Sequence, residues 1–179
     1  IGATNSGQLL ISGGSVLNNT GNTTISLGNV GGVAITGGYG YIGLNAGSTG
    51  TATVSGTGSQ WKMLGSLTVG LGGNASVNVL NGGTILSSSV RIGTSSGSTG
   101  AVAISGAGSK WTMSNTLIVG ASGSGILDIQ NGGILTDSGG SVSNSAMIGS
   151  TAGSSGTVTV SGIGSLLRIS DGFYVTGDF

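Results

Sequence analysis

Few side chains in this sequence could carry out catalytic chemistry. The 179 residues include four acids, all of them Asp, and no His or Cys. Paired carboxylates could act as a general acid and base, or could bind calcium. The acids fall at different repeat positions, so we expect neither arrangement from Asp128, Asp137, Asp171 and Asp178. Without His or Cys, a serine triad and a thiolate or imidazole metal site are impossible within this chain. The sequence therefore predicts no enzyme activity, no cofactor and no metal.

Two tryptophans occupy equivalent positions in an internal repeat. Trp61 and Trp111 lie 50 residues apart, and the third copy of the repeat has Leu167 at this position. One interpretation is an exposed aromatic stripe that stacks on carbohydrate. The other is a packing column inside the fold, and the replacement by Leu in the third copy favours it.

An insertion in one repeat is the second candidate for binding. Ile129 and Ile148 are 19 residues apart, whereas the equivalent Val79 and Ile92 are 13 apart, so about six residues are added near 137–144. Insertions in repeat proteins map to loops on one face, where binding surfaces often lie. A plain solvated turn is the alternative. The candidate partner-binding residues are Asp137, Ser138, Ser141, Ser143 and Asn144.

The charge pattern excludes two classes of partner. Four cations balance the four acids, and a net charge of zero gives no long-range attraction to nucleic acid or to an anionic membrane surface. No apolar run approaches the 20 or so residues that a spanning helix needs. We expect the four cations to point outward and to supply solubility: Lys62, Arg91, Lys110 and Arg168.

Repeats organise the chain. The segments 47–63, 97–113 and 153–169 share the pattern G-S-x-G-x-x-x-x-S-G-x-G-S, and aliphatic residues recur between them at nearly constant spacing. Two aliphatic series run along the chain. One is Ile11, Ile35, Val54, Val79, Ile104, Ile129 and Val160, and the other is Leu27, Ile42, Val69, Ile92, Val119, Ile148 and Val175.

The pattern within each repeat predicts an all-β fold. Apolar and small polar residues alternate over four to six positions between glycine-rich turns, which is typical of short strands. Three strands per unit, stacked in register, make a parallel β-solenoid of about seven coils of about 25 residues. We expect one domain over 1–179, with irregular coils over 1–46 and repeat units over 47–96, 97–152 and 153–179.

The repeat motifs point to a family. The run T-V-S-G-x-G-S-x-W, followed by L-x-V-G and an N-G-G turn, resembles the passenger domains of Gram-negative autotransporters (type V secretion). This resemblance implies a right-handed parallel β-helix, export through the outer membrane, and a membrane barrel elsewhere in the full-length protein. It further implies display at the bacterial surface or release from it.

From this resemblance we expect a non-enzymatic role as a rigid stalk or adhesive surface. The expected partners are a host-cell receptor or matrix, or identical passengers in bacterial self-association. Two alternatives stay open: a released fragment that acts as a ligand or toxin for a host receptor, and a polysaccharide-active β-helix enzyme. A stacked cluster of acids with Lys or Arg would favour the enzyme, and the sequence shows no such cluster.

Overall fold

The chain forms a stack of β-strands in three sheets. The computed structural model describes residues 6–19, 25–27, 33–36, 38–139, 146–170 and 172–175. Within these ranges there are twenty strands and no helix. Glycine and β-branched residues dominate the sequence, and both disfavour helix. The strands therefore carry the whole described architecture.

Sheet A has the longest strands of the three sheets and is entirely parallel. Its six strands each have seven residues, and they follow one another in the order of the chain. They are β1 (Ser6–Ser12), β6 (Thr49–Ser55), β9 (Asn74–Leu80), β12 (Thr99–Ser105), β15 (Ser124–Gln130) and β18 (Ser155–Ser161).

Sheets B and C are built from shorter strands. Sheet B is parallel and contains β2 (Val16–Asn19), β7 (Gln60–Met63), β10 (Thr84–Ser87), β13 (Lys110–Met113), β16 (Ile134–Asp137) and β19 (Leu166–Arg168). Sheet C contains β3 (Ile25–Leu27), β4 (Val33–Thr36), β5 (Tyr39–Ile42), β8 (Leu67–Val69), β11 (Val90–Ile92), β14 (Leu117–Val119), β17 (Ala146–Ile148) and β20 (Phe173–Val175).

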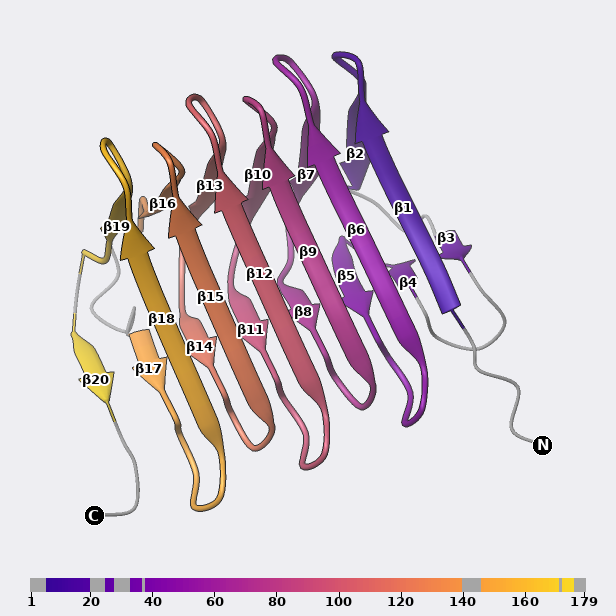
Figure 1. The fold of residues 1–179 in the computed structure, drawn as a ribbon. Coiled ribbons are helices and arrows are strands. Elements are labelled where there is room, and N and C mark those ends of the chain that lie inside the picture. The colour runs from indigo at the N-terminus through magenta and orange to yellow at the C-terminus, as the bar shows by residue number, and fades with distance from the viewer. Residues whose placement is uncertain are drawn as a thin grey trace.

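The chain visits the three sheets in turn and so winds as a right-handed β-helix. In Figure 1 it rises along sheet A in front, returns behind through sheets B and C, and moves one strand to the left with each coil. Three successive coils span 25 residues each (49–73, 74–98 and 99–123), and the next spans 31 (124–154). The predicted parallel solenoid with three strands per coil is therefore confirmed.

In-register stacking places like residues above one another. Along sheet A, Ile11 is paired with Val54, and the row continues through Val79, Ile104, Ile129 and Val160. Along sheet C, Ile42 begins the equivalent row of Val69, Ile92, Val119, Ile148 and Val175. From Val54 to Ile129, and from Ile42 to Val119, these side chains are buried in one core. The two predicted aliphatic series are correct over these stretches.

The prediction fails between β2 and β5. We expected a further coil with Ile35 and Leu27 in the two series, but β4 runs antiparallel to both of its neighbours, β3 and β5. Ile35 is paired with Gly40 and Ile25, and Leu27 is paired with Val33. Only six residues separate Ile35 from Ile42, too few to pass through two more sheets, so the chain reverses as a hairpin. Six coils result in the described residues, one fewer than predicted.

The turn from sheet A to sheet B alternates in length. It has four residues in every second coil, as in 56–59 and 106–109, and three in the coils between, as in 81–83 and 131–133. Each four-residue turn ends in a serine that joins two coils. The Ser109 hydroxyl accepts a hydrogen bond from the Gly82 N–H (3.1 Å) and donates one to the Ser105 carbonyl (2.7 Å). Ser59 and Ser165 repeat this arrangement.

The three-residue turns need glycine because they leave no room for a side chain. An added Cβ at Gly133 would lie 2.1 Å from the Ile104 carbonyl oxygen of the preceding coil. The asparagines that begin these turns, Asn81 and Asn131, have φ of 52° and 53°, a left-handed conformation that Asn tolerates better than most residues. The last glycine of the N-G-G motif is therefore required by the close approach of the turn to a strand of the preceding coil.

A charge inside the core should unfold the solenoid. Ile104 is fully buried between Val79 and Ile129, so an aspartate there would be an unpaired buried charge. We expect Ile104→Asp to abolish the cooperative thermal transition in circular dichroism. Ala101→Asp on the outer side of the same strand is the matched control and should melt within a few degrees of wild type. Equal melting of the two variants would contradict the inward row.

A methyl group in a three-residue turn should also be costly. We expect Gly133→Ala to lower the free energy of unfolding by about 1–3 kcal/mol, because its Cβ has to displace backbone of the coil below. Gly97→Asn is the control, since Gly97 has φ +77° and an added Cβ there would meet nothing within 4 Å. Urea unfolding measures both variants. A smaller loss for Gly133→Ala than for Gly97→Asn would show that the turns are not tightly stacked.

Candidate functional site

The two tryptophans belong to the interior. Trp61 on β7 and Trp111 on β13 have no exposed surface, and each stacks against Ile85 of the strand between them. The packing column is therefore the correct interpretation. The alternative of an exposed aromatic stripe for carbohydrate is wrong, because no ring face reaches the solvent.

The two indoles differ in their polar contacts. The Trp111 Nε1–H donates a hydrogen bond of 2.9 Å to the buried hydroxyl of Ser87, in the coil below. The equivalent neighbour of Trp61 is Asn19, since Asn19 faces Met63 as Ser87 faces Met113. Both the Trp61 Nε1 and the Asn19 Oδ1 are buried without a hydrogen-bond partner. The Asn19 Nδ2 instead donates to the Tyr39 carbonyl (3.1 Å).

The candidate binding loop begins with a side chain that points inward. Asp137 is the last residue of β16, is 4 % exposed, and faces the buried Met113 in the register of sheet B. Its Oδ1 accepts a hydrogen bond from the Gly139 N–H, while Oδ2 has no partner. Asp137 is therefore not a surface contact, and that part of the prediction is wrong.

The rest of the candidate loop is only partly described. Ser138 is exposed, and its hydroxyl donates to the Met113 carbonyl (3.0 Å). Ser141, Ser143 and Asn144 lie outside the described residues. The extra residues of this coil do fall between β16 and β17, where the spacing predicted them.

The two acids that the structure describes lie apart. Asp128 lies at an outward position of sheet A, Asp137 lies in the interior at sheet B, and Asp171 and Asp178 are outside the described residues. Across the described ranges, no three His, Cys, Asp or Glu side chains come close enough to hold a metal ion. The same ranges contain no apolar helix of membrane-spanning length.

The outer face of sheet A is wide and nearly neutral. Its outward side chains are small and mostly polar, and Ser and Thr recur along its rows with other residues between them. For example, the Ser76 hydroxyl donates to the Thr51 hydroxyl of the neighbouring strand (3.2 Å). Among the described residues of this face, Asp128 is the one charged group.

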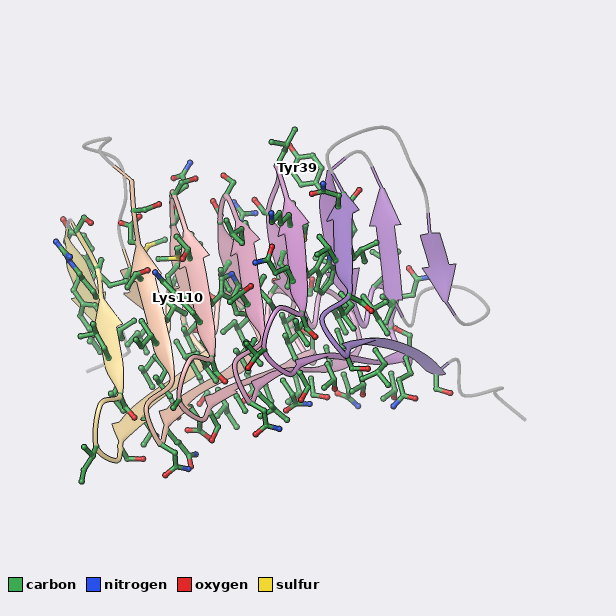
Figure 2. The ribbon with its side chains drawn as sticks, turned by 90° about the horizontal axis from the view of Figure 1, so that it is seen from above. Tyr39 and Lys110 are labelled. Carbon is green, nitrogen blue, oxygen red and sulfur yellow. The ribbon has the colours of Figure 1, made fainter. Side chains whose placement is uncertain are left out.

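The outer face of sheet B has a different character, because three of the four cations lie there. Lys62, Lys110 and Arg168 alternate along their strands with the inward tryptophans and Leu167. Figure 2 looks onto this face, with Lys110 on β13 and Tyr39 near the far corner. The fourth cation, Arg91, is on the outer side of sheet C. All four therefore point outward, as predicted.

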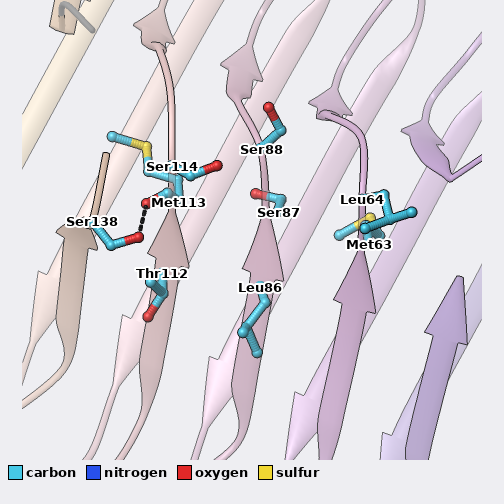
Figure 3. Close-up of a pocket in the computed structure, with 9 residues that line it drawn as sticks. All are labelled: Met63, Leu64, Leu86, Ser87, Ser88, Thr112, Met113, Ser114 and Ser138. Carbon is cyan, nitrogen blue, oxygen red and sulfur yellow. Dashed lines mark hydrogen bonds between the residues drawn. The ribbon is translucent and has the colours of Figure 1, made fainter. Parts of the chain in front are cut away.

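A shallow groove lies where sheet B turns into sheet C. It has a volume of ≈ 240 Å³ and crosses four coils (Figure 3). Its lining combines methionine and leucine side chains with the hydroxyl groups of serine and threonine. The lining residues are Met63, Leu64, Leu86, Ser87, Ser88, Thr112, Met113, Ser114 and Ser138. These groups offer apolar contact and hydrogen bonds, and they include no acid or base for catalysis.

No family model, curated protein or solved structure matches this chain.

The tryptophan contacts predict unequal costs for two equivalent substitutions. Trp111→Phe should leave the buried Ser87 hydroxyl without its donor, whereas the Trp61 Nε1 has no hydrogen bond to lose. Since an unsatisfied buried polar group costs about 1–3 kcal/mol, we expect Trp111→Phe to destabilise the protein more than Trp61→Phe by about 1 kcal/mol or more. Urea unfolding followed by circular dichroism measures the difference. Equal losses would show that the Trp111–Ser87 hydrogen bond does not contribute to stability.

Proposed function

We propose that this chain is a segment of an autotransporter-type passenger domain that acts, without catalysis, as a rigid stalk or adhesive surface on a bacterium. The resemblance of the T-V-S-G-x-G-S-x-W and N-G-G repeats to such passengers supports this proposal. The observation that carries it is the in-register stacking of the coils, which turns each outward position into a straight row of side chains. Straight rows of outward side chains suit a protein that displays a binding surface to a partner.

Rigidity supports the role of a stalk. Each coil is bonded to the next along all three sheets, and consecutive strands of sheet A share seven register pairs. The interior between the sheets is filled by side chains that include both tryptophans. Bending the stack would break backbone hydrogen bonds on one side and compress the core on the other. A solenoid can therefore hold a surface patch at a fixed distance and orientation.

The outer faces support adhesion. They combine hydroxyl groups, a few cations and scattered apolar side chains, which is the mixed character of non-obligate interaction surfaces. The partners of such a surface are a host-cell receptor or matrix, or an identical passenger on a neighbouring bacterium. Export to the bacterial cell surface is part of the same proposal, because adhesion requires exposure there.

The positions of the two described acids support a non-enzymatic role. General acid–base chemistry on a β-helix needs two or more titratable groups around one substrate. Asp128 points away from the core on sheet A, while Asp137 is buried near sheet B. These two carboxylates cannot face one substrate, and the chain has no His or Glu to replace either of them.

Display on a non-adherent bacterium tests this proposal. We expect cells that present the wild-type chain to settle faster in suspension, or to adhere to cultured host cells, compared with cells that carry the anchor alone. Cells with an equal surface amount of Ile104→Asp should do neither, because that variant lacks the folded faces. A wild-type chain that causes no clumping and no attachment, while remaining folded on the surface, would contradict the adhesive role.

A further inference from the structure

Charge is segregated between the faces of the solenoid. Lys62, Lys110 and Arg168 all lie on the outer side of sheet B. The described acids lie elsewhere, Asp128 on the outer side of sheet A and Asp137 in the core. The outer face of sheet B therefore presents three cations and no described acid, a grouping that the sequence interpretation of these residues as solubilising did not predict.

The three cations are evenly spaced along the solenoid. Lys62, Lys110 and Arg168 belong to every second coil, on β7, β13 and β19. Neighbouring strands are about 4.8 Å apart, so successive cations are separated by about 9.6 Å along the axis. Lys62 and Arg168 share one outward row, and Lys110 lies in the adjacent outward row. The long side chains can bring all three charges onto one line.

The coils between the cations present different chemistry. Leu86 and Thr84 stand between Lys62 and Lys110, and Ile134 and Thr136 stand between Lys110 and Arg168. Leu86 is 39 % exposed. Each intervening coil therefore offers one aliphatic side chain and one hydroxyl. The face alternates a positive charge with an apolar and hydroxyl-bearing segment.

We propose that the outer face of sheet B binds a linear acidic polysaccharide that carries a carboxylate on alternate sugars and lies along the axis of the solenoid. Two coils are about as long as one extended disaccharide, so each uronate carboxylate can meet one cation. The sugar between two uronates then lies with its C–H face on Leu86 or Ile134, within reach of the threonine hydroxyls. This inference rests on the proposed adhesive function and names its partner.

Two other polyanions fit this face less well. An extended acidic peptide places side chains on one side about every 6.8 Å, which does not match the two-coil spacing. Single-stranded nucleic acid is bound by stacking on exposed aromatic rings beside a strongly positive groove. The tryptophans of β7 and β13 are fully buried, and three cations over six coils make a weakly charged face. The spacing and the apolar segments favour the polysaccharide.

Binding to hyaluronan tests the proposal, because its glucuronate alternates with an uncharged sugar. The folded wild-type chain should bind a hyaluronan oligosaccharide long enough to span the six coils, and should bind it less tightly as salt is added. The triple variant K62Q/K110Q/R168Q should bind about tenfold more weakly or worse, since it removes three exposed charge pairs that each contribute modestly to binding. All three positions point outward, so the variant should melt like wild type.

Arg91→Gln is the matched control, because it removes an exposed cation from sheet C and leaves sheet B intact. It should change hyaluronan affinity by less than about twofold. A neutral cellulose oligosaccharide should bind much more weakly than hyaluronan. The proposal is overturned if wild type does not bind hyaluronan, if Arg91→Gln weakens binding as much as the triple variant, or if poly-L-glutamate binds the same residues more tightly.

The displayed chain separates this inference from the proposed function. If cells with wild-type chain adhere or clump but the triple variant does so equally well, the polysaccharide site is wrong and the adhesive role stands. If the purified chain binds hyaluronan but the displayed chain neither clumps nor attaches, the polysaccharide site stands and the adhesive role is wrong.

Discussion

The parallel backbone ladder between consecutive coils is the constraint on which the rest of the structure depends. It fixes each residue of one coil directly above its equivalent in the next, so any side chain must fit against the side chain at the same position about 4.8 Å away. Aliphatic rows gain contact from this arrangement, and hydroxyl rows gain hydrogen bonds such as that between Ser76 and Thr51. Like charges would repel, which accounts for the low charge of the chain and for the wide separation of its cations.

Much of this fold could be predicted from spacing alone. The rows through Val54, Ile104 and Ile129 follow directly from a repeat of about 25 residues, because a parallel ladder keeps the register of the sequence. The first part of the chain could not be predicted in the same way. An aliphatic residue such as Ile35 has the right spacing for the row, but spacing does not distinguish a parallel neighbour from an antiparallel one.

The orientation of side chains beyond a turn was harder to predict than the strands themselves. The alternation of apolar and polar residues shows which side chains of one strand share a face. A turn of three or four residues interrupts this alternation. The inward position of Val54 therefore does not show whether Trp61, beyond the turn, points inward or outward. The lysines beside the tryptophans were the available signal, since Lys62 and Lys110 must lie opposite to the indoles. The length of the insertion predicts a loop that begins at Asp137, whereas the register of sheet B puts this residue in the core beside Met113.

The alternation of three-residue and four-residue turns has a consequence for how such a protein can change in length. Each bridging serine finds a glycine N–H beneath it because a shorter turn lies in the preceding coil, as Ser109 finds Gly82. Duplication of a single coil in the gene would place two turns of the same length in contact, and where both have four residues one serine hydroxyl would lose that donor. Recombination would therefore be tolerated best in steps of two coils, and homologous chains should differ in length by multiples of about fifty residues.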